Sequence, residues 1–523
     1  MVALRKKGYD VRITLIMTLV MTLAANAALT GEDPLAQLAI AQNNKAQERI
    51  DNELRSRNGH TGEQFAWNLN WNLAVEIMPG VRLWKNDTWM EPTEKTLLMI
   101  ASTMQEGPDG YKGFIGPYIH PDFAEKIWHD THVGDAILIK HMLDFAIIVK
   151  ENPELREKYG ESADKFVDIA KKDLVEKWNS RGTLRIDGPF AAYEEWPLYC
   201  SPNDLKGEWH SEGKHNLFVL PFNKSLDMAA CILRLYYLTG DESYKEMATK
   251  IHTRFKAAMQ RHDGYYTWNY WEPVSEIDLL PPGVHQWNWP VAHWVDTPPN
   301  QGYQSGEVIN ILYAYHMGVV WTEDDMRRLI KTNLTAMWNG NKTTPQFRNS
   351  TSRLPGQTND DISTTAGLWR GLAPFDATIL ELLGVITRTN DPIAMKELEN
   401  ARNDEGGFTR KYFPDAEVED LPWVKDVKES AGHTFAVVIP SVVSADEQTN
   451  ILHKAHGEAS ECEVLVRPAE GGELTLISKH PMGGGGFHRI LWDGKIDGVR
   501  TPGEYVVIWR YRGGERSWPV TLQ

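Results

Sequence analysis

The sequence predicts a mainly α-helical protein, an (α/α) toroid made of a complete or incomplete ring of helical hairpins, followed by a small C-terminal β-sandwich. Three observations predict this fold class. Apolar residues recur at helical spacing from about residue 30 to 400, tight turns interrupt them at regular points, and short runs of strand-forming residues replace them after about residue 430. The composition, 42% hydrophobic with 20 tryptophans, is that of a folded, core-forming chain.

The first 27 residues have the pattern of a secretory signal peptide. Basic residues up to Arg12 precede an apolar run over 13–25, and Ala25 and Ala27 form a small-x-small cleavage pattern. A membrane anchor is the alternative, but the run is short for a span and a cleavage pattern follows it. We therefore expect export to the periplasm or the medium, with no membrane span after cleavage.

Four helical hairpins follow, with turns near residues 152, 240, 320 and 391. Turn and helix-stop residues such as Pro153, Gly240, Gly318 and Pro392 separate the two helices of each hairpin. The apolar spacing places the eight helices at 137–149, 163–174, 226–238, 244–259, 308–317, 326–338, 379–387 and 393–401. We assign 28–425 to this domain.

Long segments connect the hairpins, over about 179–215, 261–304 and 339–375. Each follows the second helix of one hairpin and precedes the first helix of the next, so in a closed ring all three emerge at the same end. Long loops inside a compact domain are usually functional. The order therefore predicts one working face, opposite the tight turns. An open solenoid is the alternative, but its repeats would have a more constant length.

The last part of the chain, 430–523, is predicted to be a β-sandwich. Short strand-forming runs lie at 434–439, 462–467, 474–477 and 505–511, with turn residues such as Gly498 between them. This part resembles the immunoglobulin-like modules that end many bacterial secreted proteins, and we assign it no catalysis.

The segment 261–304 contains nine aromatic residues together with His262, His285 and His293. Flat aromatic faces beside amides and imidazoles suit sugar rings, whose C–H faces stack while their hydroxyls form hydrogen bonds. Burial at the end of the ring is the alternative for each individual tryptophan.

Charge and motifs exclude several other classes. The chain has 55 Lys+Arg against 71 Asp+Glu and no basic run, which argues against a nucleic-acid partner. Cys200, Cys231 and Cys462 lack a metal or redox spacing, and His129 with His132 lacks a helical zinc pattern. We expect neither a metal nor a cofactor.

The signal peptide, ring of hairpins, aromatic cleft and C-terminal sandwich together resemble the (α/α)-toroid polysaccharide lyases, such as alginate, glucuronan and heparin-type lyases. In alginate lyases of this shape an Asn-His pair works with a Tyr and an Arg about fifty residues later. Here the pair is reversed, His215-Asn216, and Arg261 and Tyr266 follow at that distance. The resemblance implies β-elimination of a uronic-acid polysaccharide, that is, carbon–oxygen lyase activity.

Such a reaction needs a group that holds the carboxylate, a base and an acid. The resemblance places Asn216 or Asn223 on the carboxylate, His215 or His293 as the base and Tyr266 as the acid. Tyr303, with Gln304, is the alternative candidate. Candidates for binding the substrate are Trp128, His129, His132, Trp196, Lys214, Arg261, Trp268, Tyr270, Trp271, Trp369 and Arg370.

Three other functions remain possible for a protein with this ring. A glycoside hydrolase would use two carboxylates across the cleaved bond, and a uronate epimerase would share only the proton abstraction. A non-catalytic protein could simply hold glycans. The carboxylates beside the long segments that a hydrolase could use are Asp130, Glu194, Glu195, Glu272, Asp296, Asp360 and Asp361.

Overall fold

The computed structural model describes residues 34–56, 61–117, 128–195, 198–200, 209–211, 218–262, 264–272, 298–348, 364–419, 435–439, 441–454, 460–482, 487–511 and 514–523. Residues 1–27, the expected signal peptide, lie outside this set. No helix in the described part of the chain is long and apolar enough to cross a membrane.

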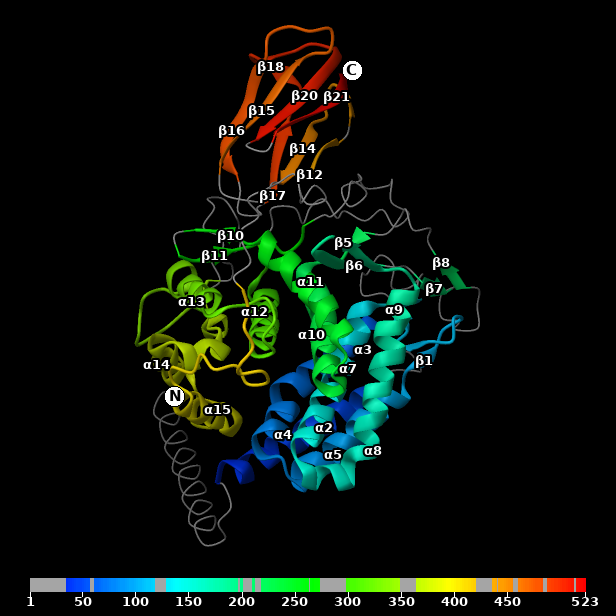
Figure 1. Ribbon diagram of the computed structural model, residues 1–523, viewed down its shortest axis with the longest axis vertical. Coiled ribbons are helices and arrows are strands. Elements are labelled where there is room, and N and C mark those ends of the chain that lie inside the picture. Colours follow the sequence, from blue (N-terminus) through cyan, green and yellow to red (C-terminus); the bar gives the residue numbers. More distant parts are fainter. Residues whose placement is uncertain are drawn as a thin grey trace, which may run out of the picture.

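The helical domain is a ring of hairpins, as the sequence predicts. Five inner helices, α3 (Gly62–Asn72), α7 (His132–Glu151), α10 (Phe222–Thr239), α12 (Gln301–His316) and α14 (Ala377–Ile386), alternate with outer helices. The outer helices are α2 (Pro34–Ser56), α8 (Pro153–Ile169), α11 (Glu242–Ala258), α13 (Glu323–Lys331) and α15 (Pro392–Asn403). The ring closes where α15 packs on α2, and α7 and α10 lie side by side at its centre (Figure 1).

Further helical segments complete the ring. They are η1 (Leu73–Ile77), α4 (Met78–Trp84), α5 (Asp87–Ser102), η2 (Ala170–Glu176), α9 (Lys177–Ser180), η6 (Thr332–Met337), η7 (Thr365–Gly367) and η8 (Arg370–Phe375). The segment η8 packs against both α12 and α14 and so bridges these two inner helices.

The inner helices α3, α7, α10 and α12 run in the same direction. Along α7 and α10, Lys140 pairs with Asp227, and one turn later along α7 Asp144 pairs with Arg234. Arg234 in turn lies over the ring of Tyr313 on α12, at 3.9 Å from its centre. The first turns of these helices therefore meet at one end of the ring.

The turns at the opposite end are tight because the chain has the right residues for them. Gly240 ends α10 in the left-handed region, at φ 74°, where a side chain would be strained. Thr322 and Asp325 form a capping box that starts α13.

The segments between the hairpins contain strands that the sequence did not predict. One sheet has the order β3 (Gly116–Pro117), β4 (Trp128–Asp130), β7 (Leu198–Cys200), β8 (Trp209–Ser211), and another has β5 (Leu184–Asp187), β6 (Phe190–Glu195), β9 (Phe218–Val219). Two hairpins, β1 (Gln105–Glu106) with β2 (Lys112–Gly113) and β10 (Gln260–Arg261) with β11 (Tyr266–Thr267), accompany them. The strands β5, β6, β10 and β11 lie at one end of the helical domain in Figure 1.

The C-terminal part is a sandwich of two sheets, as predicted. One sheet contains β12 (Phe435–Ile439), β14 (Thr449–Lys454) and β17 (Phe487–Trp492). The other has the order β13 (Val442–Val443), β21 (Gly514–Leu522), β20 (Gly503–Tyr511), β15 (Ser460–Pro468), β16 (Thr475–Met482), and β18 (Lys495–Ile496) pairs with β19 (Val499–Arg500). Val464 pairs with Trp509 in register, and both are fully buried in the core between the sheets.

Much of the tryptophan excess belongs to the helical core. Trp89, Trp178, Trp268, Trp271 and Trp321 are fully buried. The interpretation of the excess as a carbohydrate cleft therefore needs correction, since these indoles fill space between helices and strands.

Buried histidines make the stability of the fold depend on pH. Nδ1 of His252 accepts a hydrogen bond from Nε1 of Trp321 at 3.1 Å, and burial lowers the pKa of His252 to about 3. The unfolded chain has a histidine pKa of about 6.5. Between these values the unfolded state binds the extra proton, so stability is complete above about pH 6.5 and falls as the pH drops.

We expect the free energy of unfolding to decrease by up to about 1.4 kcal/mol per pH unit for this group below pH 6.5. His252→Gln keeps an acceptor for Trp321 but does not titrate, so its urea unfolding midpoint should decrease less between about pH 6.5 and 4. An equal decrease in the variant and the wild type would contradict this account of His252.

Candidate functional site

A group of polar side chains gathers where the inner helices begin, and we call it the mouth cluster. Two pairs of its members are in contact: Lys224 Nζ lies 3.4 Å from Glu63 Oε1, and the rings of Tyr270 and Tyr303 are 4.8 Å apart. The backbone N–H of Phe222 donates to the carbonyl of Tyr270 at 3.2 Å. The mouth cluster consists of Glu63, His129, Asn223, Lys224, Tyr270, Tyr303 and Glu307.

Glu307 on α12 is a buried carboxyl group whose surroundings disfavour ionisation. It has no exposed surface, its Oε2 accepts a hydrogen bond from Nε1 of Trp268 at 2.6 Å, and its Oε1 has no hydrogen-bond partner among the described residues. Burial raises its pKa well above the usual range, the charge of Asp227 adds to this, and the hydrogen bond from Trp268 opposes it. The surroundings of Glu307 therefore favour its neutral, protonated form.

The two tyrosines bring phenol hydroxyls next to this acid. Burial raises the pKa of Tyr270, and Tyr303, Glu307 and Glu63 raise it further. The hydroxyl of Tyr270 consequently stays protonated and able to donate a hydrogen bond. Tyr303 is 38% exposed, so it forms the solvent-facing side of the cluster.

The first turns of α3 and α10 supply hydrogen-bond acceptors. Oε1 of Glu63 accepts from Nε1 of Trp67 at 3.3 Å and pairs with Lys224. Oε2 of Glu63 and Oδ1 of Asn223 are buried and have no hydrogen-bond partner within the described part of the chain. Buried acceptors are normally satisfied, so these two atoms require an explanation.

His129 in the middle of β4 contributes a neutral imidazole. It is 5% exposed, and burial lowers its pKa to about 3, with Asp130 opposing this and Lys224 and Arg181 adding to it. An imidazole with such a pKa is uncharged at neutral pH and can both donate and accept a hydrogen bond.

A polar column continues from the mouth cluster between the inner helices. One turn below it, Oδ1 of Asp227 lies 3.2 Å from Lys140 Nζ and accepts from Asn310 Nδ2 at 3.3 Å. Further along, Asp144 pairs with Arg234 at 2.7 Å. The ring interior is therefore polar along its length.

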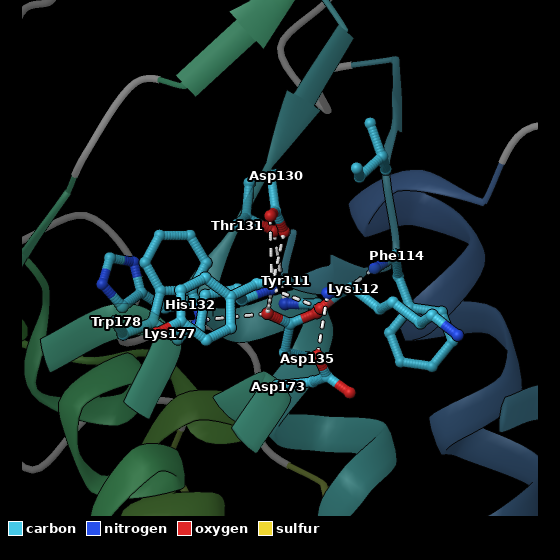
Figure 2. A network of polar contacts seen from close by, with 12 residues as sticks. Tyr111, Lys112, Phe114, Asp130, Thr131, His132, Asp135, Asp173, Lys177 and Trp178 are labelled. Atoms are coloured by element: carbon cyan, nitrogen blue, oxygen red, sulfur yellow. Dashed lines mark hydrogen bonds and ion pairs between the residues drawn. The ribbon is translucent and has the colours of Figure 1, made fainter. Parts of the chain in front are cut away.

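Behind the mouth lies a second polar network, which has a structural role (Figure 2). Lys177 has no exposed side-chain surface, and its Nζ lies 3.2 Å from Asp130 and 2.6 Å from Asp135. Asp135 also accepts from Nε1 of Trp178 at 2.9 Å and the backbone N–H of Phe114 at 3.2 Å. The network joins the start of α7 to α9 and β2.

His132, a predicted substrate-binding residue, belongs to this structural region. Its ring stacks on Trp178 with centres 3.7 Å apart, and its Nε2 lies 3.0 Å from the hydroxyl of Thr183. Burial lowers its pKa well below the usual range. The structure leaves His132 no exposed surface with which to contact a substrate.

Tyr266, the predicted catalytic acid, lies between α11 and α13 instead of at the mouth. It is fully buried, its hydroxyl donates to Asp325 at 2.7 Å, and Asp325 pairs with Lys256 at 2.8 Å. Arg261 is half-buried opposite Tyr266 in the β10–β11 hairpin. Because the hydroxyl of Tyr266 donates to this buried ion pair, Tyr266 stabilises the packing of α13 and is not available as a catalytic acid.

The structure places the other predicted residues in three groups. Asn223, Tyr270 and Tyr303 belong to the mouth cluster, and Gln304 is buried one turn before Glu307. The remaining indoles are in the core, since Trp268 packs on Trp369, Trp271 donates to the carbonyl of Val219, and only Arg370 beside them is exposed. His215, Asn216, His293, Trp196, Lys214 and the side chain of Trp128 lie outside the described residues.

Sequence reasoning missed Glu63, Lys224 and Glu307. One signal for Glu307 was available: Gln304, Glu307 and Asn310 recur every three residues along a helix that is otherwise apolar. Polar residues on an inward face of a helix require partners and so indicate a polar interior. Glu63 and Lys224 carry no comparable local signal. In the part of the chain that is described, no three His, Cys, Asp or Glu side chains are placed to hold a metal ion.

Comparison with known proteins finds little similarity. No protein-family model and no curated protein matches the chain. A similar solved structure is the Pseudomonas fluorescens alkylpurine DNA glycosylase AlkC bound to DNA containing an abasic site analog. The match spans 93% of this chain and 99% of the glycosylase chain, with 9% sequence identity and a TM-score of 0.14. A TM-score this low carries no argument about what this chain binds.

The comparisons correct the family resemblance inferred from the sequence. No family model and no curated protein of a polysaccharide lyase matches the chain, and the similar structure is a DNA glycosylase. We therefore withdraw the predicted polysaccharide lyase, its β-elimination of a uronic-acid polysaccharide and its carbon–oxygen lyase activity. We also withdraw the hydrolase, epimerase and glycan-binding alternatives and the predictions about partners, because no family model and no curated protein supports them.

Proposed function

We propose that the mouth cluster is the acid–base site of an enzyme that acts on a small hydrogen-bonding molecule, with Glu307 as the proton donor. One observation carries this proposal. Glu307 is a protonated carboxyl group with one oxygen held by Trp268 and the other without a partner among the described residues. A carboxylic acid kept neutral at neutral pH is what general-acid catalysis requires.

The proton transfer would proceed as follows. The Oε1 hydroxyl of Glu307 gives its proton to the leaving atom of the bound molecule as the bond to that atom breaks, and a water molecule forms the new bond to the other atom of the broken bond. The carboxylate that remains keeps the hydrogen bond from Nε1 of Trp268, which stabilises the new charge. Water returns the proton after the product leaves, because burial favours the neutral form of Glu307.

The unsatisfied acceptors define the chemistry of the ligand. Oε2 of Glu63 and Oδ1 of Asn223 need donors, which hydroxyl or amino groups of a bound molecule would supply. Lys224 and Tyr303 stand beside them with partly exposed side chains and would contact the same molecule. The ligand class is thus a small polar molecule with several hydrogen-bond donors.

A panel of small molecules with hydroxyl, amide or amino donors tests the binding part of this proposal. A compound present at about 100 times its Kd should stabilise the protein by about 2.7 kcal/mol, measured as a raised thermal unfolding midpoint. Asn223→Leu should abolish this shift, whereas Asn152→Ala, at the tight-turn end of the ring, should retain it. No shift with any compound, or an equal shift in Asn223→Leu, would contradict a ligand site at the mouth.

A further inference from the structure

Asp227 occupies the position directly below the mouth cluster. It lies one turn after Asn223 on α10 and is 8% exposed. Its Oδ1 contacts a side chain from each neighbouring inner helix. Lys140 Nζ of α7 lies 3.2 Å away, and Asn310 Nδ2 of α12 lies 3.3 Å away. Asp227 and Lys140 thus form an ion pair inside the ring.

The hydrogen bond from Asn310 holds the Asp227 carboxylate near Glu307. Asn310 follows Glu307 by three residues on α12, so the two side chains occupy the same side of the helix. The negative charge of Asp227 is thereby held one turn from the acid, in an interior where charges act more strongly than in water. A carboxylate beside a carboxyl group disfavours ionisation of its neighbour.

We propose that Asp227 is a positioning residue that keeps Glu307 in its protonated form, and that Lys140 limits how strongly it does so. This inference rests on the proposed function of Glu307 as a proton donor. It goes further because it names the two charged residues that control the protonation of Glu307. The pKa of Glu307 agrees with it, since Asp227 is the charge that raises this pKa after burial itself.

Other titratable groups face Glu307 as well. Tyr270, Tyr303 and Glu63 come from the segment after β11, from α12 and from α3. Burial raises the pKa of Tyr270, and Glu63 is paired with Lys224. Asp227 and Lys140 are therefore the two charges whose removal should have opposite effects on Glu307.

The test is the infrared C=O stretching band of the protonated carboxyl group, followed against pH in the full-length protein. The band that disappears in Glu307→Gln belongs to Glu307. Asp227→Asn removes a nearby negative charge and leaves the cation of Lys140, so the titration midpoint of this band should fall by about one pH unit or more. Lys140→Met leaves the charge of Asp227 uncompensated, so the midpoint should rise by a similar amount.

Opposite shifts in the two variants support the inference, because loss of packing or of stability alone would not move the midpoint in opposite directions. Unchanged midpoints in both variants, or shifts in the same direction, would overturn it while leaving Glu307 as a proton donor. Absence of a band that Glu307→Gln removes at neutral pH would overturn the proposed function itself. A circular-dichroism spectrum of each variant identifies any that fails to fold, and Asp227→Glu, which restores the charge, then serves as the second variant and should keep a high midpoint.

Discussion

Replacing Lys177 by methionine should lower the free energy of unfolding by about 3–5 kcal/mol. Lys177 is fully buried and is the cation shared by Asp130 and Asp135, which are fully buried themselves (Figure 2). Methionine fills a similar volume but leaves two carboxylates short of a positive charge. Arg181 still pairs with Asp130 at 2.9 Å, so the loss should fall mainly on Asp135.

Urea unfolding of Lys177→Met against the wild type measures this effect. Lys158→Met is the matched control, because Lys158 is paired with Asp87 on the surface, where an ion pair contributes little. Adding Asp135→Asn to Lys177→Met should recover part of the loss by removing the uncompensated carboxylate. Equal losses in Lys177→Met and Lys158→Met would contradict the account of the buried network.

Replacing Glu307 by glutamine should lower the turnover of a compound identified by the binding panel by about 10²–10⁴-fold. Glutamine keeps an oxygen to accept from Trp268 and has nearly the same shape, but it has no acidic proton to give. Binding of the compound should therefore change much less than its conversion. The readout is kcat and KM measured separately for the wild type and the variant.

The same role of Glu307 also predicts in which direction turnover changes with pH. The protonated form of Glu307 is the active one, so wild-type turnover should fall as the pH rises through its raised pKa, and this limb should be absent in Glu307→Gln. Glu323→Gln, on the exposed face of α13, should behave like the wild type. Normal turnover in Glu307→Gln, or a bound compound that the wild type leaves unchanged, would refute the role of Glu307.

The hairpins could be predicted because their signals are local. The turns expected near residues 152, 240, 320 and 391 coincide with the breaks between α7 and α8, α10 and α11, α12 and α13, and α14 and α15. Turn and helix-stop residues such as Gly240 act within a few residues of the chain, and apolar spacing needs only one helix. The strands between the hairpins went unpredicted because most are only two to four residues long, and some, such as β4 and β7, pair with distant segments.

The candidate site could be predicted only in part. Asn223, Tyr270 and Tyr303 were selected because they lie in or beside the long segments, and the structure brings them together. Tyr266 and Trp271 were selected for the same reason, yet both turn into the core. Residue type and location in a loop do not specify which way a side chain points, since that depends on the elements packed around it.

The family resemblance failed for a related reason. A ring of hairpins with a C-terminal sandwich describes an architecture, and one architecture carries many chemistries. The lyase assignment depended on His215 and Asn216, which lie outside the described residues, and on Tyr266, whose hydroxyl pairs with Asp325. The mouth cluster has to be interpreted from its own contacts.

The sequence by itself determined the four hairpins from α7 to α15, their order, their turns and the change to a β-sandwich, because apolar periodicity and turn residues act over short stretches of chain. It did not place the earlier helices α2, α3 and α5. Only the tertiary structure decided that Glu63, Asn223, Tyr270 and Glu307 meet, although they are far apart along the chain. It also decided that Glu307 holds its proton. A carboxyl group changes its pKa only when several elements remove it from water and place another charge beside it, and neither condition is a property of the residue alone.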